Sequence, residues 1–416
     1  MINKYIIFGA LTLVFLVKVT AQSNALSSSP YSLYGLGLNN ETTTGKINGL
    51  GGLGIAFPSS SFINNSNPAS LGSIQPNSFF YDFGFKAQTN TLSEGGSSSN
   101  NIIANFSNIA IAFPITKKSG FGVTLIPLTN VGYSISNIVS NIEGSDNNLF
   151  TTDIDGTGGI NSLLLNYGYA ITNKLRLGIS GSVLFGQIKQ TETDYLPYNT
   201  FIIDDVTNYS GFRAGTGIQY DVFKNLSLGA TINFPTSLDG SKSSTTTLYN
   251  STSTTDLSEN SESNIDDFKL PLEVAFGIKT SFKDYFTFNL DYKKSYWEDT
   301  NQTDKIGTYM NQDFVGLGLQ YAANKRISNF FNNLEYRAGF NYNNGNLEVN
   351  KQRIKSSAFN IGIGIPLNNG TNSMINLGYT YGNKGQITNG LIKENYHLFS
   401  INLSLEGIWF QKRKYD

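Results

Sequence analysis

Cysteine is absent from this sequence of 416 residues, and histidine occurs once, at His397. Without cysteine the chain has no disulfide, no thiol nucleophile and no cysteine for a lipid anchor. A lone imidazole nearly excludes histidine-based metal sites and serine–histidine–aspartate triads. These absences predict a protein that is not an enzyme, with no catalytic residue, no cofactor and no metal site.

Charge is also scarce. Charged residues make up 14% of the chain, against roughly 25% in average soluble proteins. Lys and Arg number 29 and Asp and Glu number 30, so the chain has no basic field to attract nucleic acid. Asp153 and Asp155 have the spacing of the first ligands of a calcium loop, but no later acidic residue completes the set. The composition therefore argues against a nucleic-acid partner.

Long apolar runs are missing after the first residues, which read MINKYIIFGALTLVFLVKVTAQ. Lys4 is followed by an apolar run over residues 6–17, which has the length of a signal-peptide core and is too short to span a bilayer. We expect a secretory signal peptide over residues 1–21, cleaved before Gln22. No later segment is apolar enough for a transmembrane helix, so a helical membrane protein is excluded.

What the sequence does have is alternation with a period of two. Phe286, Phe288, Leu290 and Tyr292 alternate with polar residues, and the same pattern recurs along most of the chain. This period is typical of strands with one apolar face, and no comparable stretch has helical periodicity. A soluble β-sandwich also alternates, but its outer faces are rich in Lys and Glu, whereas here the polar face is mostly Gly, Ser, Asn and Thr. The pattern favours an all-β transmembrane antiparallel barrel.

About fourteen strands are expected, an even number as in bacterial outer-membrane barrels. Short connections alternate with long ones, such as residues 137–158, 190–206 and 237–266, and the last of these is polar and of low complexity. Short turns on one side and long loops on the other are typical of such barrels. The expected strands lie near residues 77–88, 101–115, 119–136, 159–171, 174–189, 207–221, 224–236, 267–281, 284–297, 306–321, 330–343, 352–366, 372–382 and 393–410.

Aromatic residues gather near the ends of these strands. Tyr133, Tyr296–Trp297, Tyr379 with Tyr381, and Trp409–Phe410 are expected to form girdles at the two membrane interfaces. We place the barrel at residues 77–410, followed by a periplasmic C-terminal tail at residues 411–416. Outer-membrane lipid is then the first partner, and the cell outer membrane is the expected location.

Residues 22–76 precede the first strand and form no regular alternation. Irregular backbone cannot face hydrocarbon, because its N–H and C=O groups would be unpaired there, but it can lie inside a barrel. Gly51, Gly52 and Gly54 let a backbone pass close to the wall, and Asn67 can cap a short helical turn that starts at Pro68. We expect an N-terminal plug in the lumen; a loop ordered only by local turns is the alternative.

The stretch KINGLGGLGIAFPSSSFINNSNPASLG, residues 46–72, resembles the N-terminal segment of the FadL family of outer-membrane hydrocarbon transporters. Gly51, Gly52, Gly54 and Ala56 match its glycine-rich run, and Asn67-Pro68-Ala69 matches its Asn-Pro-Ala turn. The resemblance implies a fourteen-stranded barrel with a hatch in the lumen. The PorV proteins of type IX secretion share this opening, and SSPYSLYGLG (28–37) and GIWFQKRKYD (407–416) are similar to flavobacterial-type outer-membrane proteins.

Pro127 lies in the middle of the expected third strand, with Gly132 after it. Proline removes a ladder hydrogen bond and usually occurs at strand edges or bulges. FadL-like transporters have a kinked third strand that opens sideways into the membrane, so the resemblance implies a lateral opening at Pro127 and Gly132. A harmless bulge is the equal alternative.

Three functions follow from these features. The first is passive uptake of small hydrophobic molecules through a plugged barrel with a lateral opening. The second is a PorV-like accessory subunit of a larger outer-membrane secretion or assembly complex, with residues 237–266 as a docking loop. The third is an open polar porin, which is weaker because the N-terminal segment is expected to block the lumen.

Overall fold

The computed structural model describes residues 29–40, 43–141, 149–250, 254–257, 261–283, 285–302, 307–323, 330–367 and 370–408. The expected signal peptide, the C-terminal tail and the Trp409–Phe410 pair lie outside the described residues. The proposed boundaries of plug, barrel and tail stay predictions.

The chain forms a closed antiparallel β-barrel of fourteen strands, as the alternation predicted. Three of the fourteen are each built from two consecutive strands separated by a short break. In chain order the barrel consists of β2 (Ser78–Glu94), β3 (Ser97–Thr116), β4 (Ser119–Pro127) continued by β5 (Thr129–Asn141), β6 (Leu149–Ala170), β7 (Leu175–Tyr195), β8 (Asn199–Phe223), β9 (Leu226–Asn233) continued by β10 (Thr236–Asn250), β12 (Ser261–Leu270) continued by β13 (Glu273–Phe282), β14 (Phe286–Ser295), β16 (Gln312–Ala322), β17 (Glu335–Asn343), β20 (Ser356–Pro366), β21 (Met374–Lys384) and β22 (Lys393–Ile408).

The first and last strands close the barrel. β2 pairs with β22 along nearly its whole length, from Ser78 opposite Ile408 to Ser93 opposite Lys393. Closure pairs backbone groups that an open sheet would leave at its edges, which a lipid environment requires. Among the helices in the described ranges, none has both the length and the apolar character needed to cross a membrane.

Several expected long loops are strands, and here the sequence interpretation was wrong. Residues 237–266, expected as a polar docking loop, lie mostly in β10, β11 (Thr254–Asp256) and β12, and β10 pairs with β8 from Asn199 to Ser210. Residues 137–158 and 190–206 likewise lie mostly in β5 to β8. Ser- and Thr-rich stretches lack the apolar alternation that marks a strand, yet threonine suits the pleated backbone and the neighbouring strands pair with it.

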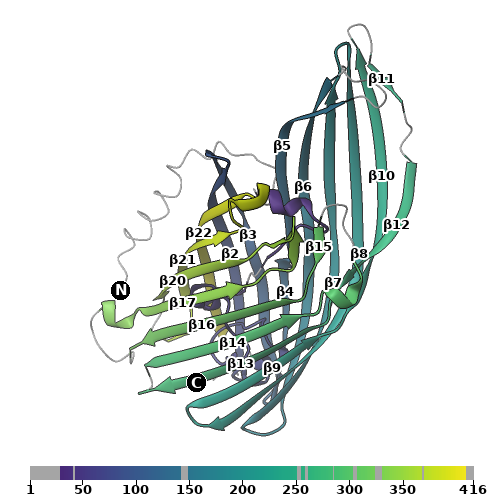
Figure 1. Ribbon diagram of the computed structural model, residues 1–416. Coiled ribbons are helices and arrows are strands. Elements are labelled where there is room, and N and C mark those ends of the chain that lie inside the picture. Colours follow the sequence, from purple (N-terminus) through teal and green to yellow (C-terminus); the bar gives the residue numbers. More distant parts are fainter. Residues whose placement is uncertain are drawn as a thin grey trace.

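These longer strands form a sheet that leans away from the rest of the barrel, at the upper right of Figure 1. We call it the extension; it consists of β5, β10, β11, β12 and the adjoining halves of β6, β7 and β8. A proline lies at each of the three strand breaks at its base, namely Pro127, Pro235 and Pro271. Because proline cannot donate to a ladder, these residues fit the places where the wall bends.

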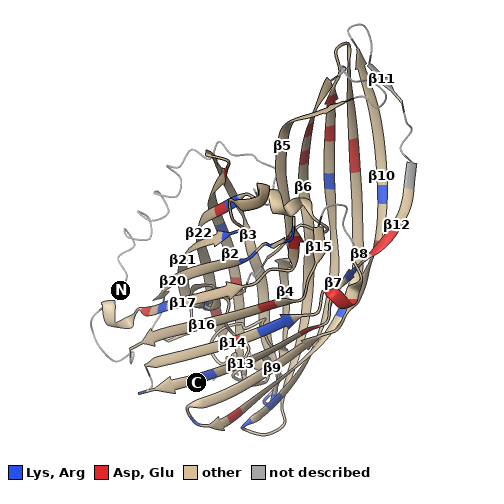
Figure 2. Cartoon of the chain, viewed as in Figure 1, with Lys and Arg blue, Asp and Glu red and all other residues tan. Residues whose placement is uncertain are grey.

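The two faces of the wall differ as a membrane barrel requires. Large apolar side chains such as Phe276, Leu317 and Phe359 are exposed on the outside, whereas Asp82, Gln219 and Asn402 are buried toward the lumen. Figure 2 shows how sparsely Lys, Arg, Asp and Glu occur over the barrel wall. The expected polar lumen face and apolar lipid face are thus confirmed.

Residues 29–40 and 43–77 lie inside the barrel and are called here the N-terminal segment (Figure 1). Its elements are η1 (Pro30–Leu33), β1 (Leu38–Asn39), η2 (Gly45–Leu50) and η3 (Pro68–Ser73).

A second, small sheet comes from the connections between barrel strands: β15 (Gly307–Tyr309), β18 (Leu347–Val349) and β19 (Gln352–Arg353). Single 3₁₀ turns complete the structure: η4 (Glu298–Thr300), η5 (Phe330–Asn333) and η6 (Thr388–Gly390).

Candidate functional site

Two buried carboxylates of the barrel wall hold the N-terminal segment. Asp82 of β2 accepts a 3.1 Å hydrogen bond from the backbone N–H of Gly45, and Asn108 and Asn402 also donate to it. On the far side of the lumen, Asp291 of β14 accepts from the N–H groups of Gly54 and Ile55 at 2.8 and 3.1 Å. Charge-assisted bonds to backbone N–H groups are stronger than neutral ones, so the segment is fixed at both sides.

The glycine-rich run lies where the segment touches the wall. Gly51 ends η2 in a left-handed conformation (φ 78°), and its carbonyl accepts a 3.2 Å hydrogen bond from the Asn341 side chain. Gly52 also has a positive φ and donates to the Ile47 carbonyl, while Gly54 donates to Asp291. The structure therefore brings all three predicted glycines into contact with η2 or the wall.

The Asn-Pro-Ala turn starts η3, as the sequence predicted. The Asn67 side chain accepts a 3.0 Å hydrogen bond from the Ala69 N–H, and its amide donates to the carbonyls of Ile55 and Ile218. Pro68 is the first residue of the turn, which ends at Ser73. The turn lies against a glycine of β7: a Cβ added at Gly178 would be 2.3 Å from the Ala69 nitrogen.

The wall is interrupted next to Pro127. β3 pairs with β4 only from Ile109 to Thr116, and β5 pairs with β6 from Val131 onward. No ladder joins β3 to β5 within the described part of the chain. We call this interruption, between residues 97–108 of β3 and residues 129–141 of β5, the seam. It adjoins both residues predicted for a lateral opening, Pro127 and Gly132.

The N-terminal segment covers the β5 side of the seam from within. β1 pairs with β5, with Leu38 opposite Asn130, and η1 exchanges two hydrogen bonds with Gly132 through Ser29 and Ser32. Asn40 donates from its backbone to the Leu128 carbonyl and from its side chain to the Pro127 carbonyl, both at 2.9 Å. Its side-chain oxygen accepts from Lys86 of β2 at 2.7 Å, so Asn40 links β2 to the β4–β5 break beside the seam.

A second contact fixes η1 to the wall on the other side of the seam. The Tyr31 hydroxyl donates to the Ile392 carbonyl at 2.6 Å, and Ser29 donates to Glu394. Burial raises the pKa of Tyr31, so its hydroxyl keeps its proton at any physiological pH and remains a donor. The start of the N-terminal segment is therefore tied to β22 and to β5 at once.

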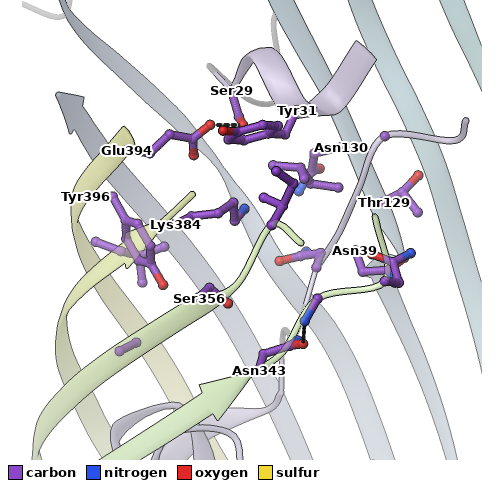
Figure 3. Close-up of a pocket in the computed structure, with 18 of the residues that line it drawn as sticks. Ser29, Tyr31, Asn39, Thr129, Asn130, Asn343, Ser356, Lys384, Glu394 and Tyr396 are labelled. Carbon is purple, nitrogen blue, oxygen red and sulfur yellow. Dashed lines mark hydrogen bonds between the residues drawn. The ribbon is translucent and has the colours of Figure 1, made fainter. Parts of the chain in front are cut away.

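A cavity of about 300 Å³ lies between the N-terminal segment and the connections between barrel strands that contain β15 and β18. Figure 3 shows Asn39, Thr129, Asn130 and Asn343 around this space, together with Ser29 and Glu394. The lining includes Asn105 of β3 and Asn130 of β5, one on each side of the seam. The cavity thus extends from the segment to the interrupted part of the wall.

One side of the cavity is aromatic. Phe268, Trp297 and Tyr309 are each less than a tenth exposed, and Trp297 stacks on Tyr309 with ring centroids 5.3 Å apart. Leu36 of the N-terminal segment packs into the same cluster. The girdle prediction was therefore wrong for Trp297, which is 4% exposed, and for Tyr133, which is buried beside Gly156. An aromatic side chain near a strand end can lie at the membrane interface or in a buried cluster. The alternation of the sequence does not distinguish these two positions.

Other residues that the sequence singled out lie outside this site. His397 shares a 2.8 Å hydrogen bond with Tyr379 on the outer face, beside Tyr381, which fits a girdle. Asp153 accepts from the N–H of Asn137 in the extension. Within the described ranges, His, Asp and Glu side chains form no group able to hold a metal ion.

The sequence matches the family model of BamG over residues 1–416, the whole chain. The chain belongs to the BamG family. No curated protein matches it significantly in sequence.

Solved structures with the same fold are outer-membrane channels. The Pseudomonas putida toluene transporter TodX is 15% identical, with a TM-score of 0.63 over 89% of this chain and 100% of that one. The CymD monoaromatic hydrocarbon channel is 16% identical (TM-score 0.62; 89% and 99% covered). A Pseudomonas aeruginosa FadL homologue is 12% identical (TM-score 0.55; 88% and 98% covered). This BamG chain therefore has a FadL-like barrel fold, as the resemblance implied; the flavobacterial type stays a prediction.

Proposed function

We propose that this BamG chain is a FadL-like channel of the bacterial outer membrane for the passive uptake of small hydrophobic molecules. A ligand enters the cavity from the side of the connections that contain β15 and β18. It rests on the N-terminal segment and leaves sideways through the seam. The segment acts as a plug, because it occupies the lumen that a straight path would need. The protein has no catalytic role in this proposal and needs no cofactor or metal.

The observation that carries the proposal is the position of the cavity against the seam. Ile103 and Asn105 of β3 and Thr129 and Asn130 of β5 line it, and no described ladder closes the wall between these two strands. The aromatic side of the cavity supplies apolar surface, and burial contributes about 25 cal/mol for each Å² removed from water. The named functions of the fold neighbours, a toluene transporter and a monoaromatic hydrocarbon channel, support the same reading.

A reversible cross-link tests the route. Leu38 and Asn130 are directly opposite each other in the β1–β5 ladder, where paired Cβ atoms lie close enough for a disulfide. Because the chain has no cysteine, Leu38→Cys with Asn130→Cys creates the single pair. Oxidation should slow the uptake of toluene into liposomes at least about fivefold, since the segment can no longer leave the seam, and a reductant should restore it.

A pair on the opposite wall is the control. Ser281→Cys with Thr287→Cys joins β13 to β14, whose ladder is continuous there, and should leave uptake unchanged in both redox states. Equal uptake by the oxidised and reduced forms of the Leu38–Asn130 pair would refute the lateral route.

A second function is favoured by the extension. A sheet that leans out from the barrel offers surface to a partner, as in an accessory subunit of an outer-membrane secretion or assembly complex (Figure 1). The docking element would then be the β10–β12 strands instead of a loop. Purification from native membranes distinguishes the two functions: a stoichiometric large partner supports the accessory role, and a lone barrel supports the channel.

A further inference from the structure

The cavity is unusually rich in amides for a hydrocarbon site. Nine of the residues that line it are asparagines, contributed by the N-terminal segment, β3, β5, β17, β20 and the connection after β17. A ligand pocket is ordinarily apolar with a few placed polar groups, and those groups set which molecules it accepts. The asparagine side chains therefore bear on the chemistry of the ligand.

Four buried polar atoms at this cavity have no hydrogen-bond partner within the described residues. Three are donors: Trp297 Nε1, Asn105 Nδ2 and Asn360 Nδ2. The fourth is an acceptor, Asn130 Oδ1. Trp297, Asn360 and Asn130 are 4%, 4% and 8% exposed, and all four residues line the cavity. A buried donor or acceptor without a partner costs free energy. The cavity should therefore bind a molecule that hydrogen-bonds to these atoms more tightly than one that only covers them.

Other amides at the cavity are already used by the protein. Asn48 donates to Asn402, and Asn341 donates to the Gly51 carbonyl. Asn343 accepts from Gln312 and from the Gly345 N–H. The four unpaired atoms are therefore a distinct subset, and two of them, on Asn105 and Asn130, come from opposite sides of the seam.

The charged residues at the cavity do not call for a charged ligand. Lys86 donates to Asn40, and Glu394 accepts from Ser29 and lies opposite Lys384 in the β21–β22 ladder. These three are the charged side chains among the described lining residues. Each has a polar or oppositely charged neighbour in the protein, so a neutral ligand leaves none of them isolated.

From these contacts we propose that the cavity selects a small uncharged molecule with an apolar, ring-like body that bears a hydroxyl or carbonyl oxygen, in preference to a pure hydrocarbon. The oxygen accepts from Trp297 Nε1 or an asparagine amide, a hydroxyl can also donate to Asn130 Oδ1, and the ring packs toward Phe268 and Tyr309. This selectivity rests on the proposed channel function and refines it by naming the class of substrate.

Two matched probes test the selectivity, para-cresol and para-xylene, which differ by one hydroxyl in place of a methyl group of similar volume. Equilibrium dialysis measures the binding of each labelled probe to the full chain in lipid nanodiscs, with the binding to empty nanodiscs subtracted. We expect para-cresol to bind at least tenfold more tightly. Equal or tighter binding of para-xylene, or no binding of either probe, overturns the proposal.

Variants assign the preference to the unpaired atoms. Trp297→Phe removes the indole N–H but keeps an aromatic ring, and Asn130→Leu removes the amide; each should cut the cresol-to-xylene ratio at least threefold. Asn225→Leu, on an exposed turn, should keep the full ratio. Trp297→Phe keeps the test valid if Asn130→Leu fails to fold, and a ratio unchanged in every folded variant overturns the proposal.

The dialysis experiment tests the selectivity, and the cross-link tests the channel function, so the two proposals can fail independently. If para-cresol is preferred in dialysis but the cross-linked seam does not slow uptake, the lateral route fails and the selectivity stands. If both probes bind equally and the cross-link still slows uptake, the selectivity fails and the channel stands.

Discussion

Asn40 links two parts of the barrel wall beside the seam. Its amide group reaches Pro127 on β4 and Lys86 on β2, while its backbone N–H reaches Leu128 at the strand break. A single residue thus joins β2 to the break between β4 and β5, beside the seam. Sequence alone could not reveal this, because a single asparagine outside any alternating stretch has no distinguishing pattern.

Replacing Asn40 with alanine should loosen the seam. The change removes two side-chain hydrogen bonds, each with a net contribution of about 0.5–1.5 kcal/mol, and keeps the backbone bond. The two bonds together contribute about 1–3 kcal/mol, so toluene uptake should rise at least about fivefold, since tenfold corresponds to about 1.4 kcal/mol. Asn225→Ala is the control. Unchanged uptake together with unchanged amide exchange at residues 127–132 would contradict the role given to Asn40.

Gly178 on β7 shows why the wall needs a glycine opposite the Asn-Pro-Ala turn. An added Cβ would lie 2.3 Å from the Ala69 nitrogen and 2.4 Å from the Pro68 carbonyl carbon, both backbone atoms that cannot rotate away. Gly178→Ala should lower the free energy of unfolding by about 1–3 kcal/mol, as overpacking does. Urea unfolding in lipid vesicles measures it.

The same strand supplies the control for that prediction. A Cβ at Gly181 would meet only the ring of Phe212, at 3.0 Å, and that side chain is 60% exposed and free to turn. Gly181→Ala should therefore change stability by less than about 0.5 kcal/mol, the usual range for surface substitutions. Equal losses for the two variants would show that contact with the N-terminal segment is not the cause.

At the scale of the elements, apolar alternation was enough to place all fourteen strands, because each buries or exposes one face consistently. Strand ends in the extension were missed, since segments such as residues 243–250, SSTTTLYN, carry no such alternation. These residues form a strand because β8 extends far enough to pair with them. The local sequence pattern gives no information about that pairing. The cavity was missed for a related reason: asparagine at an inward position looks like any other polar lumen residue.

Arg213 of β8 holds the extension where two strands break. Its guanidinium donates to the carbonyl of Phe234 at 3.0 Å and to that of Pro271 at 2.6 Å, and it lies 3.1 Å from Glu273. Both carbonyls flank breaks at which a ladder bond is lost. One side chain thus supplies a hydrogen-bond donor to a carbonyl at each of the two breaks.

Arg213→Met should therefore destabilise the base of the extension. It removes the ion pair with Glu273, which keeps hydrogen bonds from Asn233 and Ser295. Because the paired side chains are 11% and 21% exposed, the cost should lie below that of a fully buried pair, about 3–5 kcal/mol. Amide hydrogen exchange of β10 and β12 should speed up much more than that of β17 or β20. Lys189→Met removes an exposed pair with Asp204, 51% and 39% exposed, and should have almost no effect. Uniform acceleration over the whole barrel would disprove a local role.

For the whole molecule, the N-terminal segment is packed as part of the fold. Ile63, Leu71 and Ile74 form one cluster with Phe80, Ala110 and Ala112 of the wall, and Ile47 and Leu50 pack with Phe57 and Phe62 in another. The Lys46 ammonium lies 4.4 Å from the centre of the Phe62 ring and 3.8 Å from Glu335. The lateral route proposed above therefore requires movement only of the first residues of the segment, near the seam.

Removal of residues 43–76 should convert the barrel into an open pore. The intact chain in a planar bilayer should show no steady single-channel current, because η2 and η3 fill the lumen; the shortened chain should show discrete conductance steps. Asp82 and Asp291, which lose the backbone N–H groups of Gly45, Gly54 and Ile55, would then face water in the pore. Circular dichroism establishes that the shortened barrel has folded. Steady conductance of the intact chain, equal to that of the shortened one, would mean that the segment does not block the lumen, and the polar-porin function would replace the channel proposed here.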